Sequence, residues 1–155
     1  MRSRWIVMLA SAAIAAAAIV VSLVSVSSAK LGGPTVHVIE HATTDAVIDI
    51  GATGDTTGDL LTFANKVYDQ NDGKVVGHDL GSCVRISPAK GSWQCSWTTW
   101  VGDGSITISG PFYDTRDSAM AIIGGTGVYS GATGNMLLKS RNGGLEYDFI
   151  FRLGP

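Results

Sequence analysis

Two cysteines flank a short turn in the middle of the chain and are spaced for a disulfide bond. A hairpin symmetric about Ala89 pairs residue 87 with 91, 85 with 93 and 83 with 95, which places Cys83 opposite Cys95 on one face. If the chain is exported, as its first 29 residues predict (see below), this arrangement predicts a disulfide bond between the two strands. The alternative is a free, reactive thiol at Cys83, because a register shift of one residue would turn the two side chains to opposite faces.

Asp79 could supply acid–base chemistry. Side chains two residues apart on a strand share a face, so Asp79 points inward if Cys83 does. An unpaired buried carboxylate is costly, so it finds a partner or its pKa rises, and it can then act as a general acid or base. The alternative is that Asp79 lies in water at the rim of the fold.

Metal, hydrolase and kinase sites are not expected. His37 and His41 would lie about 13 Å apart along a strand, at roughly 3.3 Å per residue, which is too far to chelate one metal ion together. The sequence contains no Gly-x-Ser-x-Gly, His-Glu-x-x-His or phosphate-binding motif. We therefore predict that the protein has no metal site and is neither a hydrolase nor a kinase.

The glycine-rich segment 121–131 looks at first like a dinucleotide-binding loop. In that fold the loop opens a helix, and a further strand with an acidic residue follows about twenty positions on. Only 24 residues follow Gly131, and they alternate like two strands. We therefore exclude nucleotide binding and expect the glycines to permit a sharp bend between strands, with positive backbone φ angles.

The elements that must position these residues are strands. Apolar and polar residues alternate with a period of two, and no window of eleven or more residues after residue 29 shows a helical stripe. We expect eight strands, at 35–41, 60–69, 74–86, 92–101, 105–113, 119–124, 134–141 and 145–152. Eight short antiparallel strands in one all-β domain close most simply into a barrel, which leaves no exposed edge.

The chain divides into three stretches. Residues 1–29 carry two arginines, an apolar run and a final Ser-Ser-Ala, which predicts an export signal cleaved after Ala29; the alternative is an uncleaved membrane anchor. Residues 30–58 hold the first strand and a long flexible loop rich in Thr, Asp and Gly, which is a lid, a binding loop or a disordered segment. Residues 59–155 form the remainder of the single barrel.

Charge and export restrict the partners. Without Arg2 and Arg4, nine lysines and arginines remain against 13 acidic residues, a net charge of about −4. Such a surface repels phosphate backbones, so no nucleic-acid partner is expected. We predict a secreted, extracellular protein that contacts a membrane only if the leader stays uncleaved.

Four segments then carry a family resemblance. Residues 57–69 (TGDLLTFANKVYD), 76–84 (VGHDLGSCV), 108–112 (ISGPF) and 121–134 (AIIGGTGVYSGATG) resemble the successive motifs of plant allene oxide cyclases, and the glycine-rich parts are similar to those of dirigent proteins. The resemblance implies an eight-stranded antiparallel β-barrel, often a homotrimer, which uses no cofactor. It also implies an apolar pocket that folds a reactive substrate, a fatty-acid allene oxide in the cyclases, for ring closure to a cyclopentenone.

The resemblance also assigns site residues. Glu40 matches a glutamate that favours epoxide opening, and Asn65 matches an asparagine that helps hold a water against the epoxide oxygen, so these two are the expected catalytic residues. Cys83 matches a pocket cysteine. Where the family has Gly-Pro-Tyr, this chain has Gly110-Pro111-Phe112, which loses the hydroxyl group.

Alternation along the strands predicts a mostly apolar pocket with a few polar groups, the usual character of a small-molecule site. The expected substrate-binding residues are Phe63, Asp79, Cys83, Trp97, Phe112, Tyr147 and Phe149. The alternative is a filled core, in which Phe63, Trp97 and Phe149 meet and leave no space. We expect a barrel that binds an apolar small molecule and steers its intramolecular cyclisation, and the alternatives are a non-catalytic binding barrel for a hydrophobic ligand and a structural module.

Overall fold

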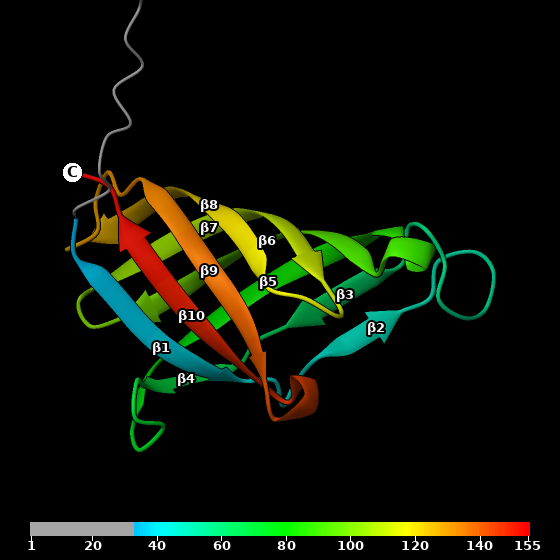
Figure 1. Cartoon of the computed structure of the whole chain (residues 1–155), viewed down its shortest axis with the longest axis horizontal. Coiled ribbons are helices and arrows are strands. Elements are labelled where there is room, and N and C mark those ends of the chain that lie inside the picture. The colour runs from blue at the N-terminus through cyan, green and yellow to red at the C-terminus, as the bar shows by residue number, and fades with distance from the viewer. Residues whose placement is uncertain (1–32) are drawn as a thin grey trace, which may run out of the picture.

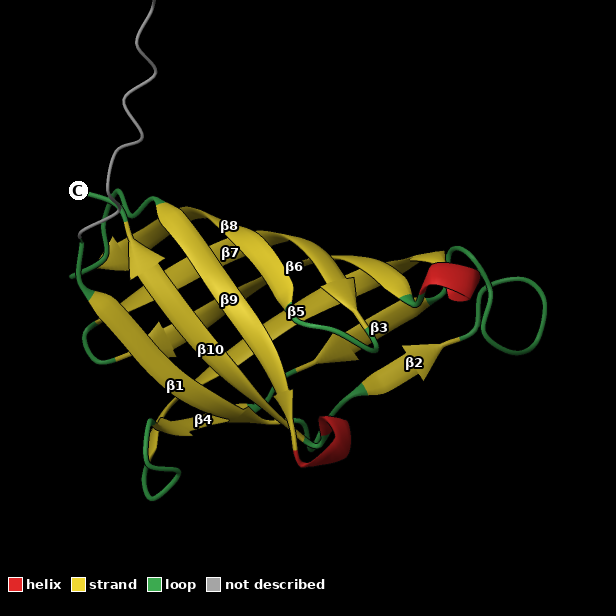
Figure 2. Cartoon of the chain, in the orientation of Figure 1, coloured by secondary structure: helices red, strands yellow, loops and turns green. Residues whose placement is uncertain are grey.

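The computed structural model describes residues 33–155, and most of these residues lie in strands (Figure 2). The strands are β1 (Thr35–His41), β2 (Ala46–Ile48), β3 (Leu60–Phe63), β4 (Lys66–Asp69), β5 (Val75–Ser87), β6 (Ser92–Val101), β7 (Gly104–Tyr113), β8 (Ser118–Gly127), β9 (Gly134–Arg141) and β10 (Glu146–Leu153). The predicted leader at 1–29 lies outside the described residues. Among residues 33–155, no helix has the length and apolar character needed to cross a membrane.

The strands close into an antiparallel barrel (Figure 1). Around the barrel, β4, β1, β10, β9, β8, β7, β6 and β5 are successive neighbours, and β5 pairs back onto β4. β3 and β4 both pair with β5 and occupy one strand position between them. The predicted all-β, eight-stranded antiparallel barrel is therefore confirmed.

The strand predicted at 60–69 is interrupted at Ala64 and Asn65. Here the backbone N–H of Asn65 donates to the carboxylate of Asp79 (3.1 Å), and the Asn65 carbonyl accepts from the Asp79 N–H (2.9 Å). The side chain of Asp79 thus replaces a backbone partner in the ladder. The periodicity alone did not reveal this break, because Asn65 keeps the inward parity of its neighbours.

The glycine-rich segment continues β8 rather than bending at once. Gly124 and Gly125 pair with β7, and positive φ angles appear later, at Gly127 (59°) and Gly131 (76°). The strand predicted at 119–124 was therefore too short at its end. No helix follows it within the described residues apart from the short 3₁₀ turn Asn142–Gly144, which agrees with the exclusion of a dinucleotide fold.

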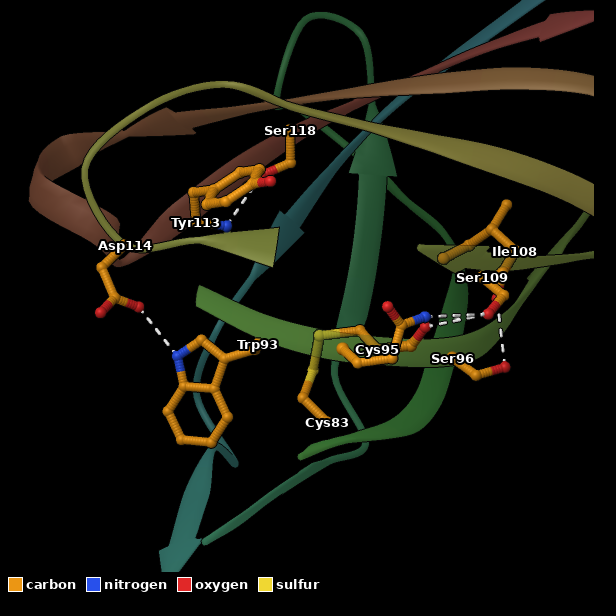
Figure 3. The surroundings of a disulfide bond; sticks show 10 residues. Cys83, Trp93, Cys95, Ser96, Ile108, Ser109, Tyr113, Asp114 and Ser118 are labelled. Carbon is orange, nitrogen blue, oxygen red and sulfur yellow. Dashed lines mark hydrogen bonds between the residues drawn. A yellow bond between two sulfur atoms is a disulfide. The ribbon is translucent and has the colours of Figure 1, made fainter. Parts of the chain in front are cut away.

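The β5–β6 hairpin has the predicted register, and Cys83 and Cys95 form a disulfide bond (Figure 3). The alternative of a free thiol at Cys83 is excluded. One predicted pair is wrong: Ser87 lies opposite Ser92 rather than Gly91. The reason is that residues 88–90 form a 3₁₀ turn that closes with Gly91 at a φ of 55°, so the ladder shifts by one residue beside the turn.

The segment 43–58 contains one element that the sequence did not predict. The three residues of β2 pair with β3, so the segment is not a loop throughout. Farther along, the carboxylate of Asp59 accepts the backbone N–H groups of Ile50 (2.9 Å) and Thr56 (2.7 Å). The segment is therefore tied to the barrel before and after its exposed turn at 51–55.

Candidate active site

The barrel interior contains a cavity of about 70 Å³. Its lining combines aromatic, aliphatic and carboxyl side chains, from Glu40, Asp45, Leu61, Phe63, Cys83, Trp97, Phe112, Leu138, Tyr147 and Phe149. The cavity thus brings together Glu40 and six of the seven residues predicted to bind substrate. The remaining two site residues, Asn65 and Asp79, are buried and do not line the cavity.

Three aromatic side chains meet in the middle of the barrel. The ring centroids of Phe63 and Trp97 lie 5.8 Å apart, and those of Trp97 and Phe149 lie 5.3 Å apart. Gly81 allows this packing, because a Cβ atom there would lie only 2.2 Å from the Cβ of Trp97. The three rings meet, as the alternative of a filled core predicted, but they do not fill the interior completely. A cavity remains beside them.

The size of this cavity limits what it can admit. Typical small-molecule sites span roughly 300–1,000 Å³, whereas this cavity is about 70 Å³. Only the reacting end of a molecule fits beside the carboxyl groups in this conformation. Phe63 and Trp97 line the cavity, so a smaller side chain at either position would enlarge it.

Asn65 organises the carboxyl groups at the polar end of the cavity. Its Nδ2 donates to Glu40 Oε1 (2.8 Å) and to Asp45 Oδ1 (2.7 Å). Its Oδ1 accepts from the backbone N–H groups of Thr43 (3.0 Å) and Thr44 (2.9 Å) and from the Thr44 hydroxyl. The amide is therefore fully engaged within the protein and positions the two carboxyl groups; that Asn65 holds a water against a substrate remains a prediction.

Asp79 lies behind this amide and is completely buried. Its Oδ1 accepts the N–H of Asn65, and its Oδ2 receives no hydrogen bond from any N–H or hydroxyl in the described part of the chain. The Glu40 carboxyl lies within hydrogen-bonding reach of Asp79. Asp79 is thus an inward, buried carboxyl, and the alternative of a solvated rim position is excluded.

Burial determines the protonation of this pair. Loss of water raises the pKa of Glu40 well above its ordinary value, and the negative charges of Asp79 and Asp45 raise it further. Burial likewise raises the pKa of Asp79, to about 7. None of the ion pairs within residues 33–155 brings a cation to Glu40, Asp45 or Asp79. Burial and the mutual repulsion of the two groups therefore both favour the protonated form of Glu40, beside Asp79.

Tyr147 supplies a phenol to the same cavity. It pairs with Glu40 across β1 and β10, and its ring packs edge-on against Phe112 at 5.8 Å. Burial, followed by the charge of Glu40, raises the pKa of Tyr147 to about 12. A neutral hydroxyl is thus present in the cavity even though Phe112 replaces the tyrosine of the related motif.

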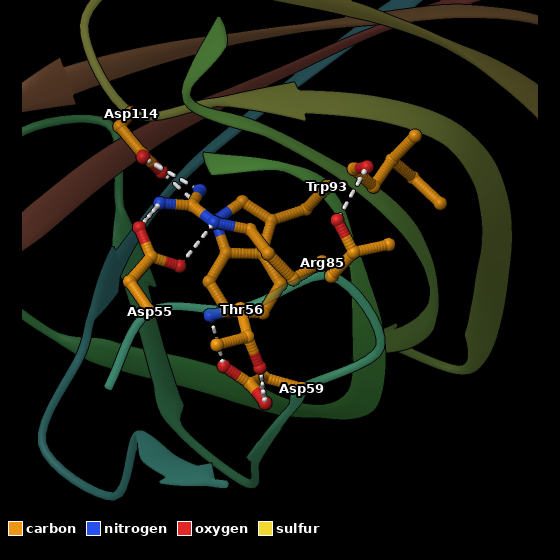
Figure 4. A network of polar contacts seen from close by, with 8 residues as sticks. Asp55, Thr56, Asp59, Arg85, Trp93 and Asp114 are labelled. Carbon is orange, nitrogen blue, oxygen red and sulfur yellow. Dashed lines mark hydrogen bonds and ion pairs between the residues drawn. The ribbon is translucent and has the colours of Figure 1, made fainter. Parts of the chain in front are cut away.

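A second polar cluster sits where the segment 43–58 returns to the barrel (Figure 4). The buried guanidinium of Arg85 pairs with Asp55 and Asp114 and lies over the Trp93 ring, 4.5 Å from its centroid. Trp93 Nε1 donates to Asp114 at 2.8 Å. This Arg85 cluster ties the segment that carries Asp45 to β5 and to the turn after β7.

Sequence reasoning missed Asp45. It stands in the stretch interpreted as a loop, just before a short apolar run at 46–50 that contains β2. That run was the only signal available, and it does not show that Asp45 reaches the cavity. The contact depends on the amide of Asn65, twenty residues away.

Comparison with known proteins places the chain in a family. Residues 37–146 match the model of the family described as allene oxide cyclase, so the chain belongs to this family. The resemblance identified in the sequence is therefore confirmed over most of the barrel.

Solved structures share the same fold. A pyocyanin demethylase matches with a TM-score of 0.65 at 26% identity, over 76% of this chain and 100% of that chain. A pterocarpan synthase dirigent protein matches with a TM-score of 0.61 at 19% identity, over 76% of this chain and 85% of the other. An exo-specific intermolecular Diels-Alderase matches with a TM-score of 0.53 at 16% identity, over 79% and 100%.

Proposed function

We propose that this protein is an exported isomerase that binds an apolar small molecule and steers its intramolecular ring closure. The observation that carries the proposal is a buried carboxyl group, Glu40, that lies at the polar end of an apolar cavity, where burial raises its pKa well above the ordinary value. The disulfide bond between Cys83 and Cys95 supports an extracellular, oxidising location.

The proposed chemistry divides between the two ends of the cavity. Glu40 donates its proton to an oxygen of the substrate, which draws electrons from the carbon skeleton and makes the ring-forming carbon electrophilic. The aromatic walls restrict the substrate to few conformers, so part of the entropic barrier to ring closure is removed on binding. The apolar walls limit the water beside the reacting atoms, which would otherwise add to the electrophile.

The related structures are compatible with such a role. They are named for a demethylation, a pterocarpan synthesis and a Diels–Alder addition. One barrel architecture thus carries several reactions, and the reaction must be argued from the cavity of this chain. Here the cavity offers a proton donor and apolar walls, which suit an acid-catalysed isomerisation.

A fatty-acid allene oxide, generated in situ from its hydroperoxide, is the first substrate to test. We expect the purified protein to raise the yield of cyclopentenone and to favour one enantiomer over the racemic spontaneous product. Glu40→Gln and Asn65→Ala should abolish this effect with a modest loss of binding. Asp103→Asn, an exposed carboxylate in the β6–β7 turn, is the matched control and should behave as the wild type. A racemic product at the spontaneous yield would contradict the cyclase proposal for this substrate.

The alternative function is a barrel that binds a hydrophobic ligand without catalysing a reaction. The full engagement of the Asn65 amide within the protein favours it, because that amide has no free donor for a substrate. Native mass spectrometry of protein purified from the secretions of its own cells would show a retained lipid-like or aromatic molecule in either case. A ligand that is released unchanged by both the wild type and Glu40→Gln would favour the binding barrel.

A further inference from the structure

Asp45 faces the same cavity as Glu40 and has no role in the chemistry proposed above. One nitrogen atom joins the two carboxyl groups, since Asn65 Nδ2 donates to Glu40 Oε1 at 2.8 Å and to Asp45 Oδ1 at 2.7 Å. An amide nitrogen has two hydrogens, so each carboxyl group receives one. The two groups are therefore held side by side at the polar end of the cavity.

The chain around Asp45 is held in place independently of any ligand. The backbone N–H groups of Thr43 and Thr44 donate to Asn65 Oδ1, and the Thr44 hydroxyl accepts the N–H of Ala64 at 2.8 Å. On the other side of Asp45, β2 begins at once and pairs with β3. A carboxylate that is fixed at both flanks and directed to a cavity is suited to act on a bound molecule.

The surroundings of the two carboxyl groups differ. Glu40 is 5% exposed and Asp45 is exposed, at the outer side of the cavity. The groups that face Glu40 from the neighbouring elements are Asp45, Asp79 and the phenol of Tyr147. The negative charge of Asp45 is one of the causes that raise the pKa of Glu40. When environments separate two neighbouring carboxyl groups in this way, one suits the role of acid and the other that of base.

We propose that Asp45 is a catalytic base that acts together with Glu40 as the acid. This inference rests on the proposed function and narrows its substrate class. The substrate must carry an acidic O–H or C–H group as well as an oxygen that accepts a proton, both within reach of the polar end of the cavity.

The proposed step is balanced within the substrate and the two carboxyl groups. Asp45 takes the proton from the acidic O–H or C–H group, and the electron pair left behind forms the new ring bond. The electron pair displaced from the conjugated system moves to the acceptor oxygen, which takes the proton of Glu40. Transfer of the proton from Asp45 to Glu40, which share the Asn65 amide, then restores the starting state, and the product is an isomer of the substrate.

A probe reaction tests the base without knowledge of the natural substrate. In 5-nitrobenzisoxazole, removal of the ring C–H proton by a carboxylate completes a nitrile, breaks the N–O bond and releases a coloured nitrophenolate. We expect the full protein to accelerate this opening, in the wild type or in a Trp97→Ala background that enlarges the cavity. Asp45→Asn, which keeps the acceptor for Asn65 but removes the base, should lower the rate on the order of 10²-fold and abolish the acidic limb of the pH–rate profile.

Asp49→Asn is the matched control, because Asp49 lies on the same segment, is exposed and is absent from the cavity lining. It should keep the rate within about twofold, and thermal unfolding should show that both variants are folded. The proposal is overturned if Asp45→Asn keeps the wild-type rate and pH profile, or if neither background accelerates the probe. A third outcome separates the two proposals: the wild type does not raise the yield of cyclopentenone, but its opening of the probe depends on Asp45. This result would reject the cyclase function and still support Asp45 as a base.

Discussion

The protein holds two clusters of acidic side chains, each built around a buried side chain, and the two clusters differ in one component. In the Arg85 cluster, a guanidinium pairs with Asp55 and Asp114. In the cluster around Asn65, the three carboxyl groups of Glu40, Asp45 and Asp79 surround a neutral amide, and no ion pair within residues 33–155 brings a cation to them. The pKa of Asp55 is lowered, chiefly by its hydrogen bonds to Arg85, whereas burial raises the pKa of both Glu40 and Asp79.

This difference predicts a structural role for the Arg85 cluster and a catalytic one for the Asn65 cluster. A carboxylate beside a buried guanidinium stays ionised and holds two segments together, so it has no proton to give. A buried carboxyl group without a cation keeps its proton and can donate it to a substrate. We therefore expect substitutions in the Arg85 cluster to affect stability and substitutions in the Asn65 cluster to affect turnover.

The largest effect is expected on turnover. Glu40→Gln should lower the rate of ring closure on the order of 10²-fold or more, because it removes the proton donor while it preserves the side-chain volume and the acceptor for Asn65. Arg85→Met should lower the rate less than threefold. Steady-state kinetics on the substrate identified for the wild type measure both. Equal losses in the two variants would remove the distinction between the clusters.

Arg85→Met should have the larger effect on stability. The variant leaves Asp114 and Asp55 without their buried cation and removes the contact with the Trp93 ring. Because both aspartates are partly exposed, we expect a loss of about 2 kcal/mol, below the range for a fully buried pair. Urea unfolding followed by tryptophan fluorescence measures it. A stability equal to that of the wild type would show that the cluster does not hold the segment.

The two clusters should respond to pH in opposite directions. The raised pKa values of Glu40 and Asp79 mean that these groups hold protons in the folded state that the unfolded chain releases near pH 4, so the free energy of unfolding should fall as pH rises from about 4 through 7. The lowered pKa values of Asp55 and Asp59 give the reverse response, with stability lost below about pH 4. Urea titrations from acid to alkaline pH measure both. Glu40→Gln should flatten only the upper part of the curve.

The smallest effect is expected for Asp55→Asn. Asp55 is half exposed, so water already screens its interaction with Arg85, and Asp114 still pairs with the guanidinium. The loss of stability should be clearly smaller than that of Arg85→Met and confined to pH values at which Asp55 is ionised. A loss as large as that of Arg85→Met would assign the stabilisation to this one pair.

Local patterns in the sequence predicted most of the fold. Alternation with a period of two identified the barrel strands, and the ranges of β1, β6 and β9 agree with the prediction. The same parity placed Asp79 inside the barrel, and symmetry about Ala89 paired Cys83 with Cys95. Each of these inferences uses information from neighbouring residues or from one short hairpin only.

The missing parts of the site depend on contacts between distant residues. Asp45 reaches the cavity because Asn65, twenty residues later, binds its carboxylate, and no periodicity marks that contact. The break at Asn65 likewise depends on the side chain of Asp79 entering the ladder. The raised pKa values of Glu40 and Asp79 follow from burial without a cation from residues 33–155 beside them, which only the assembled barrel reveals. The predicted homotrimer stays a prediction.

The central claim is that burial without a cation keeps Glu40 protonated beside the cavity. Infrared spectroscopy of the pure protein across a pH titration tests it directly, because a protonated carboxyl group has a carbonyl band separate from that of carboxylates. We predict that the wild type retains a protonated carboxyl band at pH 7 and that Glu40→Gln weakens it to the part that Asp79 contributes, whereas Asp103→Asn keeps it at full intensity. A wild-type spectrum at pH 7 that contains only carboxylate bands would contradict the account.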